Sequence, residues 1–363
     1  MGSFDSNKVL PKSVCIESAA NILCQHGLYY GNELKLKFYQ NPILLFILFI
    51  IVVIKNTINA MNSEQNAMII ITLGDFTHFL GIRLYFNIAL NLFTILIINS
   101  QLIYYYNYKT GVKPTFLYVF EMMSGKLSPK SVGLTDPTII TNLLRITKML
   151  VNIIQFNNQI IIPIFAFIVS MVPIITNFTF MQTIIFGIPS SLLFIVYAYC
   201  AWNVMLYQLA YFHILCFYLK LKIIDINNKL KVLSNTTNSY QIYEQLVKMD
   251  LLYKEINEYN TTYWSKFLLS FWLTYGSATI LLLYIIIFIE MSFYIKFIYI
   301  YAFIVFGSIF LFIIFKASSI NLETFKSYYI LNNLLISLNQ KRIKRLAIKF
   351  KVCIFNFECY IKF

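Results

Sequence analysis

This chain of 363 residues has 29 Lys and Arg against 15 Asp and Glu, a formal net charge of +14, yet only 12% of its residues are charged and 59% are hydrophobic. Soluble domains hold about 25% charged residues, whereas residues 149–219 contain none. The composition excludes a soluble nucleic-acid-binding protein and predicts a polytopic membrane protein whose basic residues face anionic lipid.

The positive charge is clustered along the chain. All but three of the Lys and Arg residues fall within residues 1–40, 107–158, 208–266 and 316–363, and the exceptions are Lys55, Arg83 and Lys296. Cytoplasmic loops of membrane proteins are enriched in Lys and Arg. The four basic stretches are therefore expected to share the cytoplasmic side, and nucleic acid is not expected as a partner.

The segments between the basic stretches are apolar and long enough to cross a membrane, which takes about 20 residues. We predict an all-α polytopic protein of about six transmembrane helices within a domain at residues 38–315. Both termini, residues 1–37 and the basic helix 316–363, would lie in the cytoplasm of a plasma-membrane protein. The predicted spans are residues 38–60, 80–106, 160–176, 182–207, 267–289 and 297–315.

The apolar segment 67–82 contains Asp75 and His78 and is followed by Arg83. Counting it as a further span would place residues 107–158 and 208–266 on opposite sides of the membrane, against the positive-inside pattern. We therefore expect it to form part of an external loop or the outer end of the second span.

Residues 208–266 predict a cytoplasmic helical hairpin, because apolar side chains recur there at spacings of three and four. An apolar seam needs a partner, so we expect the hairpin to pack on itself or on sister subunits as an oligomer anchor. A hairpin resting on lipid head groups is the alternative. The seams are Leu219, Ile223, Ile226, Leu230 and Leu233, then Ile242, Leu246, Met249, Tyr253 and Ile256, and a third amphipathic stretch follows at Leu322, Phe325, Tyr329, Leu335 and Leu338.

Motifs for catalysis are missing from the sequence. His26, His78 and His213 have no metal-ligand spacing, and the glycines form no phosphate-binding loop or nucleophile elbow. We expect neither an enzyme nor a metal or cofactor. The span centres have essentially no charged residues, which argues against an ion-coupled transporter. The remaining classes of protein are a receptor for uncharged or apolar ligands, a channel and a structural membrane protein.

The outer halves of the spans are rich in aromatic and polar residues, a composition that suits a pocket for a small organic ligand. Ordinary helix packing with interfacial Tyr anchors is the alternative, and Arg83 and Glu290 could simply pair with each other or with Lys296. The candidate ligand-binding residues are Arg83, Tyr85, Asn87, Asn91, Met171, Gln182, Tyr284, Glu290, Tyr294 and Tyr299.

Asn177-Phe178-Thr179 is a glycosylation sequon in the predicted external loop between spans three and four. It agrees with the proposed topology and makes Asn177 a candidate glycosylation site. Two further sequons, at Asn235 and Asn260, fall in loops that the charge pattern places inside.

The layout resembles the arthropod gustatory and odorant receptor superfamily. The resemblance covers roughly residues 36–350 and rests on the basic N-terminus, the long first inner loop "NYKTGVKPTFLYVFEMMSGKLSPKSVGL" and the segments "HILCFYLKLKIIDINNKLKVL" and "LLYKEINEYNTTYWSKFLLSFWLTYGSATILLLY". It implies a tetrameric ligand-gated cation channel of seven spans, anchored by its cytoplasmic helices and gated by its last span.

The sequence departs from that family at its end. The Thr-Tyr and Gln-Phe signature of the last span is absent, and "VCIFNFECYIKF" after Lys351 is too short and too charged to cross a membrane. We therefore expect a chain that lacks the pore helix.

Our prediction is a gustatory-receptor-like chemoreceptor that binds small organic molecules, contacts membrane lipids and forms a homo- or hetero-oligomer. A G-protein-coupled receptor and a membrane facilitator or transporter are the alternatives.

Overall fold

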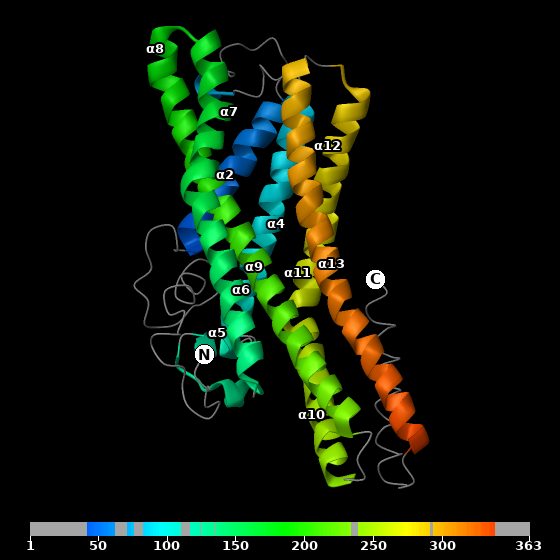
Figure 1. The fold of residues 1–363 in the computed structure, drawn as a ribbon. Coiled ribbons are helices and arrows are strands. Elements are labelled where there is room, and N and C mark those ends of the chain that lie inside the picture. Colours follow the sequence, from blue (N-terminus) through cyan, green and yellow to red (C-terminus); the bar gives the residue numbers. More distant parts are fainter. Residues whose placement is uncertain are drawn as a thin grey trace.

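The computed structural model describes residues 42–61, 71–75, 83–109, 117–123, 125–134, 136–233, 239–290 and 293–337. Within these ranges every regular element is helical, and the helices form one elongated bundle (Figure 1). Five helical stretches are long and apolar enough to cross a membrane: residues 83–100, 137–177, 180–233, 265–288 and 299–334. The predicted all-α membrane fold is confirmed.

The first half of the bundle follows the predicted spans with two additions. The helix α2, the first predicted span, has a shorter described apolar stretch, Leu45–Met61, and packs along α4. A short helix and a 3₁₀ turn follow before the long helix that contains the third span. The elements are α2 (Pro42–Met61), α4 (Arg83–Lys109), α5 (Leu117–Met123), the 3₁₀ turn Pro129–Val132, α6 (Pro137–Phe156) and α7 (Ile162–Asn177).

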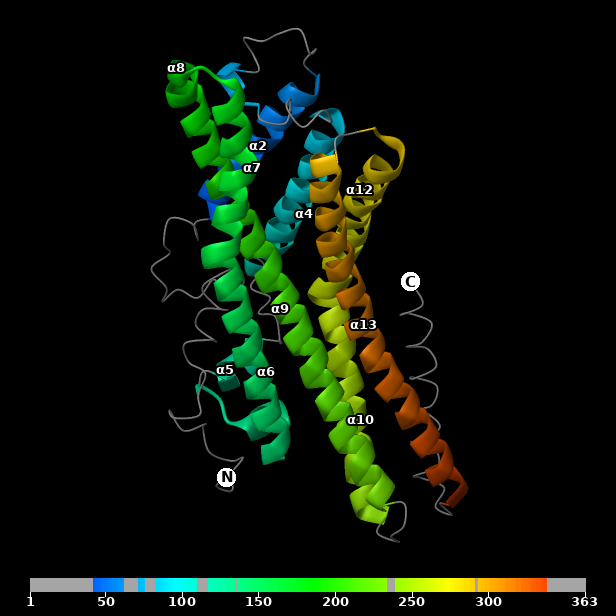
Figure 2. The same ribbon diagram turned by 45° about the horizontal axis from the view of Figure 1, so that its top comes forward.

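The second half contains two helices that run almost the full length of the molecule. These are α9 and α13, which pack against each other, while α10 returns along α9 as the predicted hairpin (Figures 1 and 2). The elements are α8 (Phe180–Gln182), α9 (Ile188–Leu233), α10 (Ser239–Tyr259), α11 (Ser265–Phe271), α12 (Ser277–Phe288) and α13 (Phe293–Ser337).

Four π-helical turns interrupt these helices without ending them. They lie at Asn157–Ile161, Thr183–Gly187, Asn260–Trp264 and Trp272–Gly276. A π turn inserts one extra residue and so rotates the side chains that follow about the helix axis. Two of them join α6 to α7 and α10 to α11, where the predicted inner segments meet the spans.

The helix α6 corrects the sequence prediction, which left residues 107–158 as an inner loop. Its buried residues recur at three- and four-residue spacings, a pattern visible in the sequence: Ile140, Leu143, Leu144, Thr147, Val151 and Ile154. Because α6 continues through the π turn into α7, the third membrane-crossing helix begins at Pro137 and not at residue 160.

The N-terminus of α6 is capped by Asp136. Its side chain accepts hydrogen bonds from the backbone amide and the hydroxyl of Thr138, at 2.8 and 2.7 Å. These bonds stabilise the carboxylate and lower its pKa below the ordinary value. The cap and Pro137 at the first helical position together fix where the helix begins.

The centre of the bundle is aromatic. The ring of Tyr275 stacks between Phe271 and Phe306, with centroids 4.6 and 4.9 Å away. Phe93 of α4 and Trp202 of α9 each contact the ring of Phe306 as well. This cluster joins α4, α9, the α11–α12 segment and α13 at mid-height, and large rings supply the contact area that holds the four together.

The two seams of the α9–α10 hairpin are buried within a single chain. Nine of the ten predicted seam residues are buried and Leu233 is partly buried, and all belong to the main core or pack against it. Within this one chain α9 and α10 pack along each other, with α6 and α13 also lying against α9.

The third amphipathic stretch is not a separate helix, because α13 runs unbroken from its span to Ser337. Its predicted apolar residues Leu322, Phe325 and Tyr329 point outward, with exposures of 59, 59 and 65%. The buried face carries Leu331 and Leu334 instead. The side chain of Leu335, and Leu338 with all that follows it, lie outside the described residues.

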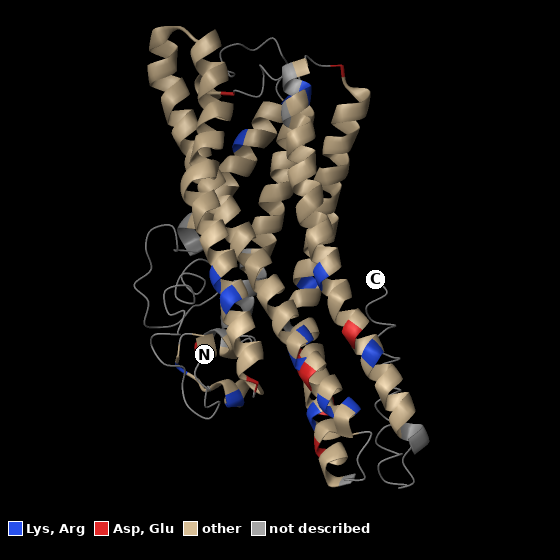
Figure 3. Cartoon of the chain, viewed as in Figure 1, with Lys and Arg blue, Asp and Glu red and all other residues tan. Residues whose placement is uncertain are grey.

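Charged residues gather at one end of the bundle. The blue and red segments of the ribbon concentrate on α10 and the adjoining parts of α6, α9 and α13, while the opposite half is mostly tan (Figure 3). The described parts of the stretches 107–158, 208–266 and 316–363 are thus brought together in space. The N-terminal and C-terminal stretches, residues 1–37 and 338–363, lie outside the described residues.

Candidate functional site

Three of the predicted ligand-binding residues meet in an aromatic cluster between α4, α12 and α13, in the half of the bundle away from the charged end. The rings of Tyr85 and Tyr284 lie 5.9 Å apart. Tyr299 is 3% exposed and meets Phe86 edge to face at 6.3 Å. Leu282 and Ile285 of α12 complete the buried core beneath them.

The Tyr299 hydroxyl is the chemically notable group of this aromatic cluster. It is buried, and no hydrogen-bond partner for it lies among the described residues. Leaving a buried hydroxyl unpaired costs free energy, so this atom is suited to hydrogen-bond a polar group brought in by a ligand. The surrounding rings would contact an apolar body.

Two other predicted residues face the opposite side of α4. Arg83 and Asn87 are both buried, and the Asn87 amide donates to the Arg83 carbonyl at 2.8 Å. The guanidinium of Arg83 pairs with Asp75 at 2.5 Å, and the Asp75 side chain is fully buried. The sequence had left Glu290 as the acidic partner of Arg83, so the pairing with Asp75 is a correction.

The remaining predicted residues do not join either group. Asn91 donates to Thr57 of α2 at 3.3 Å, and Glu290 is exposed just beyond α12. Gln182 and Thr179 cap α8 through reciprocal hydrogen bonds, and Met171 lies on α7, across the bundle from α12 (Figures 1 and 2). Tyr294 is the second residue of α13, and its side chain is outside the described part.

A small polar cavity lies between α2, α4, α9 and the segment 71–75. Its volume is about 20 Å³, enough for one or two water-sized groups and far below the 300–1,000 Å³ typical of organic-ligand pockets. The lining residues are Val52, Lys55, Asn56, Asn59, Gly74, Asp75, Asn87, Leu90, Leu193, Phe194 and Tyr197.

Sequence reasoning missed most of this cavity. Lys55, Asn56 and Asn59 stand in the predicted first span, and the spans were taken as essentially free of charge. The signal was present, because Lys55 is one of only three basic residues outside the basic stretches. Polar residues within a membrane-spanning segment are costly and mark functional sites.

The segment that covers the cavity is held by a glycine turn. Gly74 has a positive φ of 58°, and a Cβ there would lie 2.2 Å from Ser190 Oγ. That hydroxyl donates to the Leu73 carbonyl at 3.0 Å. Only glycine allows this close approach, which fixes Asp75 over the cavity against α9.

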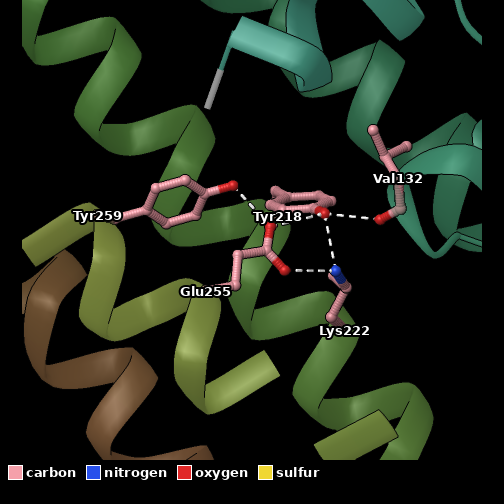
Figure 4. A network of polar contacts seen from close by, with 5 residues as sticks. All are labelled: Val132, Tyr218, Lys222, Glu255 and Tyr259. Atoms are coloured by element: carbon pink, nitrogen blue, oxygen red, sulfur yellow. Dashed lines mark hydrogen bonds and ion pairs between the residues drawn. The ribbon is translucent and has the colours of Figure 1, made fainter. Parts of the chain in front are cut away.

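A second polar site lies at the charged end, where α9, α10 and the loop before α6 meet. The Tyr218 hydroxyl donates to the Val132 carbonyl at 2.7 Å, and Lys222 Nζ donates to the same hydroxyl at 2.9 Å and to Glu255 Oε2 at 2.7 Å. Tyr259 donates to Glu255 Oε1 at 2.6 Å. Figure 4 shows Glu255 at the centre of this network.

The predicted glycosylation site Asn177 is the last residue of α7. Its amide donates to the Pro173 carbonyl at 2.7 Å and to the Thr176 hydroxyl at 2.8 Å, so the side chain folds back on its own helix. Glycosylation at Asn177 stays a prediction.

Comparison with solved structures finds a similar fold. The chain matches the insect olfactory receptor OR5 from Machilis hrabei with a TM-score of 0.58 and 12% sequence identity, over 94% of this chain and 88% of that one. No protein-family model and no curated protein sequence matches the chain. This chain and that receptor thus share a fold.

Proposed function

We propose that this protein is a chemosensory membrane receptor that binds small organic molecules and acts as, or within, a ligand-gated cation channel. The observation that supports this most strongly is the fold that it shares with an insect olfactory receptor over almost its whole length. We further propose a plasma-membrane location with the charged end of the bundle, and the N-terminus, in the cytoplasm.

The proposed ligand site is the aromatic cluster of Tyr85, Phe86, Tyr284 and Tyr299. It combines ring faces from three helices with one buried hydroxyl, that of Tyr299, for which the described part of the chain offers no hydrogen-bond partner. A volatile or taste compound with an apolar body and one polar group fits this chemistry. We also propose that its ligands include taste compounds.

The proposed oligomer would not use the hairpin seams for contacts between subunits, because they are buried within one chain. We propose that the subunits instead contact one another through three exposed residues of α13, Leu322, Phe325 and Tyr329. They lie on one side of the helix near the charged end, and an exposed apolar stripe of this kind marks an interaction site. A tetramer, homo- or hetero-oligomeric, is the proposed assembly.

The test is ligand-evoked cation current in cells that express the chain alone or with candidate partner subunits, across a panel of odorants and tastants. Tyr299→Phe should weaken responses to ligands with a hydrogen-bonding group about three- to tenfold, as expected for one lost hydrogen bond, and leave purely apolar ligands unchanged. Tyr301→Phe is the matched control, because Tyr301 is 52% exposed on the same helix. Substrate flux without current would favour a facilitator instead.

A further inference from the structure

The polar cavity between α2, α4 and α9 has a charge imbalance that the aromatic ligand site does not share. Among the described residues that line it or pair directly with its lining, Lys55 and Arg83 are cationic and Asp75 alone is anionic. Asp75 is fully buried and already bound to Arg83 at 2.5 Å. The described surroundings therefore hold one positive charge in excess.

The cavity also presents unsatisfied amides. Asn56 is 6% exposed and Asn59 is 2% exposed, and the Asn56 Nδ2 and Asn59 Oδ1 atoms have no hydrogen-bond partner among the described residues. Both residues line the cavity beside Lys55. An anion can accept hydrogen bonds from a buried N–H donor and from an ammonium group beside it. Hydrogen bonds to charged groups are stronger than those between neutral groups.

The size of the cavity restricts what can bind. A volume of about 20 Å³ admits a group of one or a few atoms and excludes a whole odorant. From charge, donors and size we propose that this cavity is a binding site for a small anion, either an inorganic ion such as chloride or a single carboxylate group, held by Lys55 and the amide of Asn56.

This site would have a structural consequence. The anion would neutralise the excess charge inside the membrane-spanning half, where an uncompensated charge is costly. It would also tie α2 to the segment 71–75, which is itself bonded to α9 through Ser190. The proposal does not depend on ligand-gated conduction, because binding is measurable without any current.

The experiment uses the purified full chain in nanodiscs of uncharged lipid, with sodium salts of chloride, formate, acetate or bulky gluconate at equal ionic strength. An anion that binds the folded state and not the unfolded state stabilises the folded protein by mass action. Chloride or formate should therefore raise the apparent melting temperature by about 2–4 °C relative to gluconate. A response to chloride identifies an inorganic ion, and a response to formate and acetate but not chloride identifies a carboxylate group.

Lys55→Gln should abolish the difference between small and bulky anions, whereas Lys296→Gln, a change of the same kind outside the cavity lining, should preserve it. If Lys55→Gln does not fold, Asn56→Asp supplies the second test, because a fixed carboxylate beside Lys55 should replace the anion and remove the dependence. Equal melting temperatures in all four salts, or an undiminished difference in the Lys55 or Asn56 variant, would overturn the proposal.

Discussion

One hydroxyl joins three parts of the chain at the charged end of the molecule. Tyr218 of α9 bonds the loop before α6 through Val132, and through Lys222 it is linked to Glu255 of α10. The Tyr218 ring is itself 1% exposed. A buried polar network of this kind is stabilising only when each member is satisfied, so single atoms within it have measurable effects.

Tyr218→Phe removes the donor to the Val132 carbonyl and the acceptor of Lys222 while keeping the ring. We expect a loss of about 1–3 kcal/mol in the free energy of unfolding, the cost of leaving a buried partner unbonded. Thermal unfolding in detergent measures it. Tyr240→Phe, on the 76%-exposed Tyr240 of α10, should change little, and equal effects of the two variants would contradict the assignment.

Gly133 is the residue that lets this loop approach α9. Its φ is 79°, and an added Cβ would lie 3.2 Å from both Cε and Nζ of Lys222. Gly133→Ala should cost about 1–2 kcal/mol from the left-handed backbone alone, as measured by thermal unfolding. Gly307→Ala is the control, because a Cβ there meets nothing within 4 Å and alanine favours the helix. A stabilising Gly133→Ala would refute this account.

At the scale of elements, the helices differ in what starts and holds them. The helix α6 begins at a defined cap and continues through a π turn into α7, whereas α9 is a long helix whose lower part is fixed by its partners. Burial of Leu230, Ile242 and Leu246, each at most 1% exposed, sets the register of the hairpin. Because a carboxylate caps α6, we expect the stabilising effect of this cap to depend on pH. Because buried side chains set the register of the hairpin, we expect its stability to depend on their volume.

The cap of α6 should lose strength in acid. Because hydrogen bonds from Thr138 lower the pKa of Asp136 in the folded protein, its stabilising contribution is complete above the unfolded carboxyl pKa of about 3.9. The contribution is lost as the pH falls through the lower folded value. Thermal unfolding against pH should show Asp136→Ala about 0.5–2 kcal/mol less stable near neutrality, with the difference from wild type shrinking below pH ~4.

Asp136→Asn is the matched control, because asparagine caps a helix about as well as aspartate and does not titrate. It should be close to wild type near neutrality and show no such acid-dependent loss at this cap. An Asp136→Ala deficit that stays constant down to the lowest pH would show that the carboxylate charge has no part in the cap.

Leu230 tests the packing of the hairpin. It is 0% exposed at the interface of α9 with its neighbours, so Leu230→Ala should leave a cavity and cost about 2–5 kcal/mol. Val232, two residues on and 67% exposed, should tolerate alanine within about 0.5 kcal/mol. Thermal unfolding of the two variants distinguishes a buried seam from a surface one, for which both changes would be small.

At the scale of the whole molecule, charge and apolar exposure are distributed differently. Most of the charged residues that the structure describes lie at one end of the bundle (Figure 3). Exposed apolar residues continue from the apolar part of α13 into that end, at Leu322, Phe325 and Tyr329. In water such a stripe is unfavourable without a partner. The proposed oligomer therefore has a specific surface to test.

Phe325→Glu should shift the purified protein from an oligomer to a monomer, because it places a charge in the centre of the stripe. Light scattering coupled to size-exclusion chromatography measures the mass. Tyr240→Glu, at a side chain 76% exposed on α10, is the control and should leave the mass unchanged. A Phe325→Glu protein with the wild-type oligomeric mass would remove this surface from the assembly.

The sequence was sufficient for the features that depend on local composition and period. Apolar length predicted the membrane-spanning helices, and spacings of three and four predicted the buried seam residues from Leu219 to Ile256. The same rule would have found α6, whose buried positions follow it from Ile140 onward. The helix α6 was not predicted from the sequence, because the Lys and Arg residues of this segment were taken only as evidence for an inner loop.

The pairing of residues distant in the chain was decided by the tertiary structure alone. The placement of Lys55 beside Asp75, and the contacts of Tyr218 with Val132 and Glu255, follow from how the helices pack. Periodicity shows which face of a helix is apolar but not which neighbour covers it. For this reason the predicted ligand residues separated into an aromatic group and a polar group on opposite sides of α4, and only the packed bundle distinguishes them.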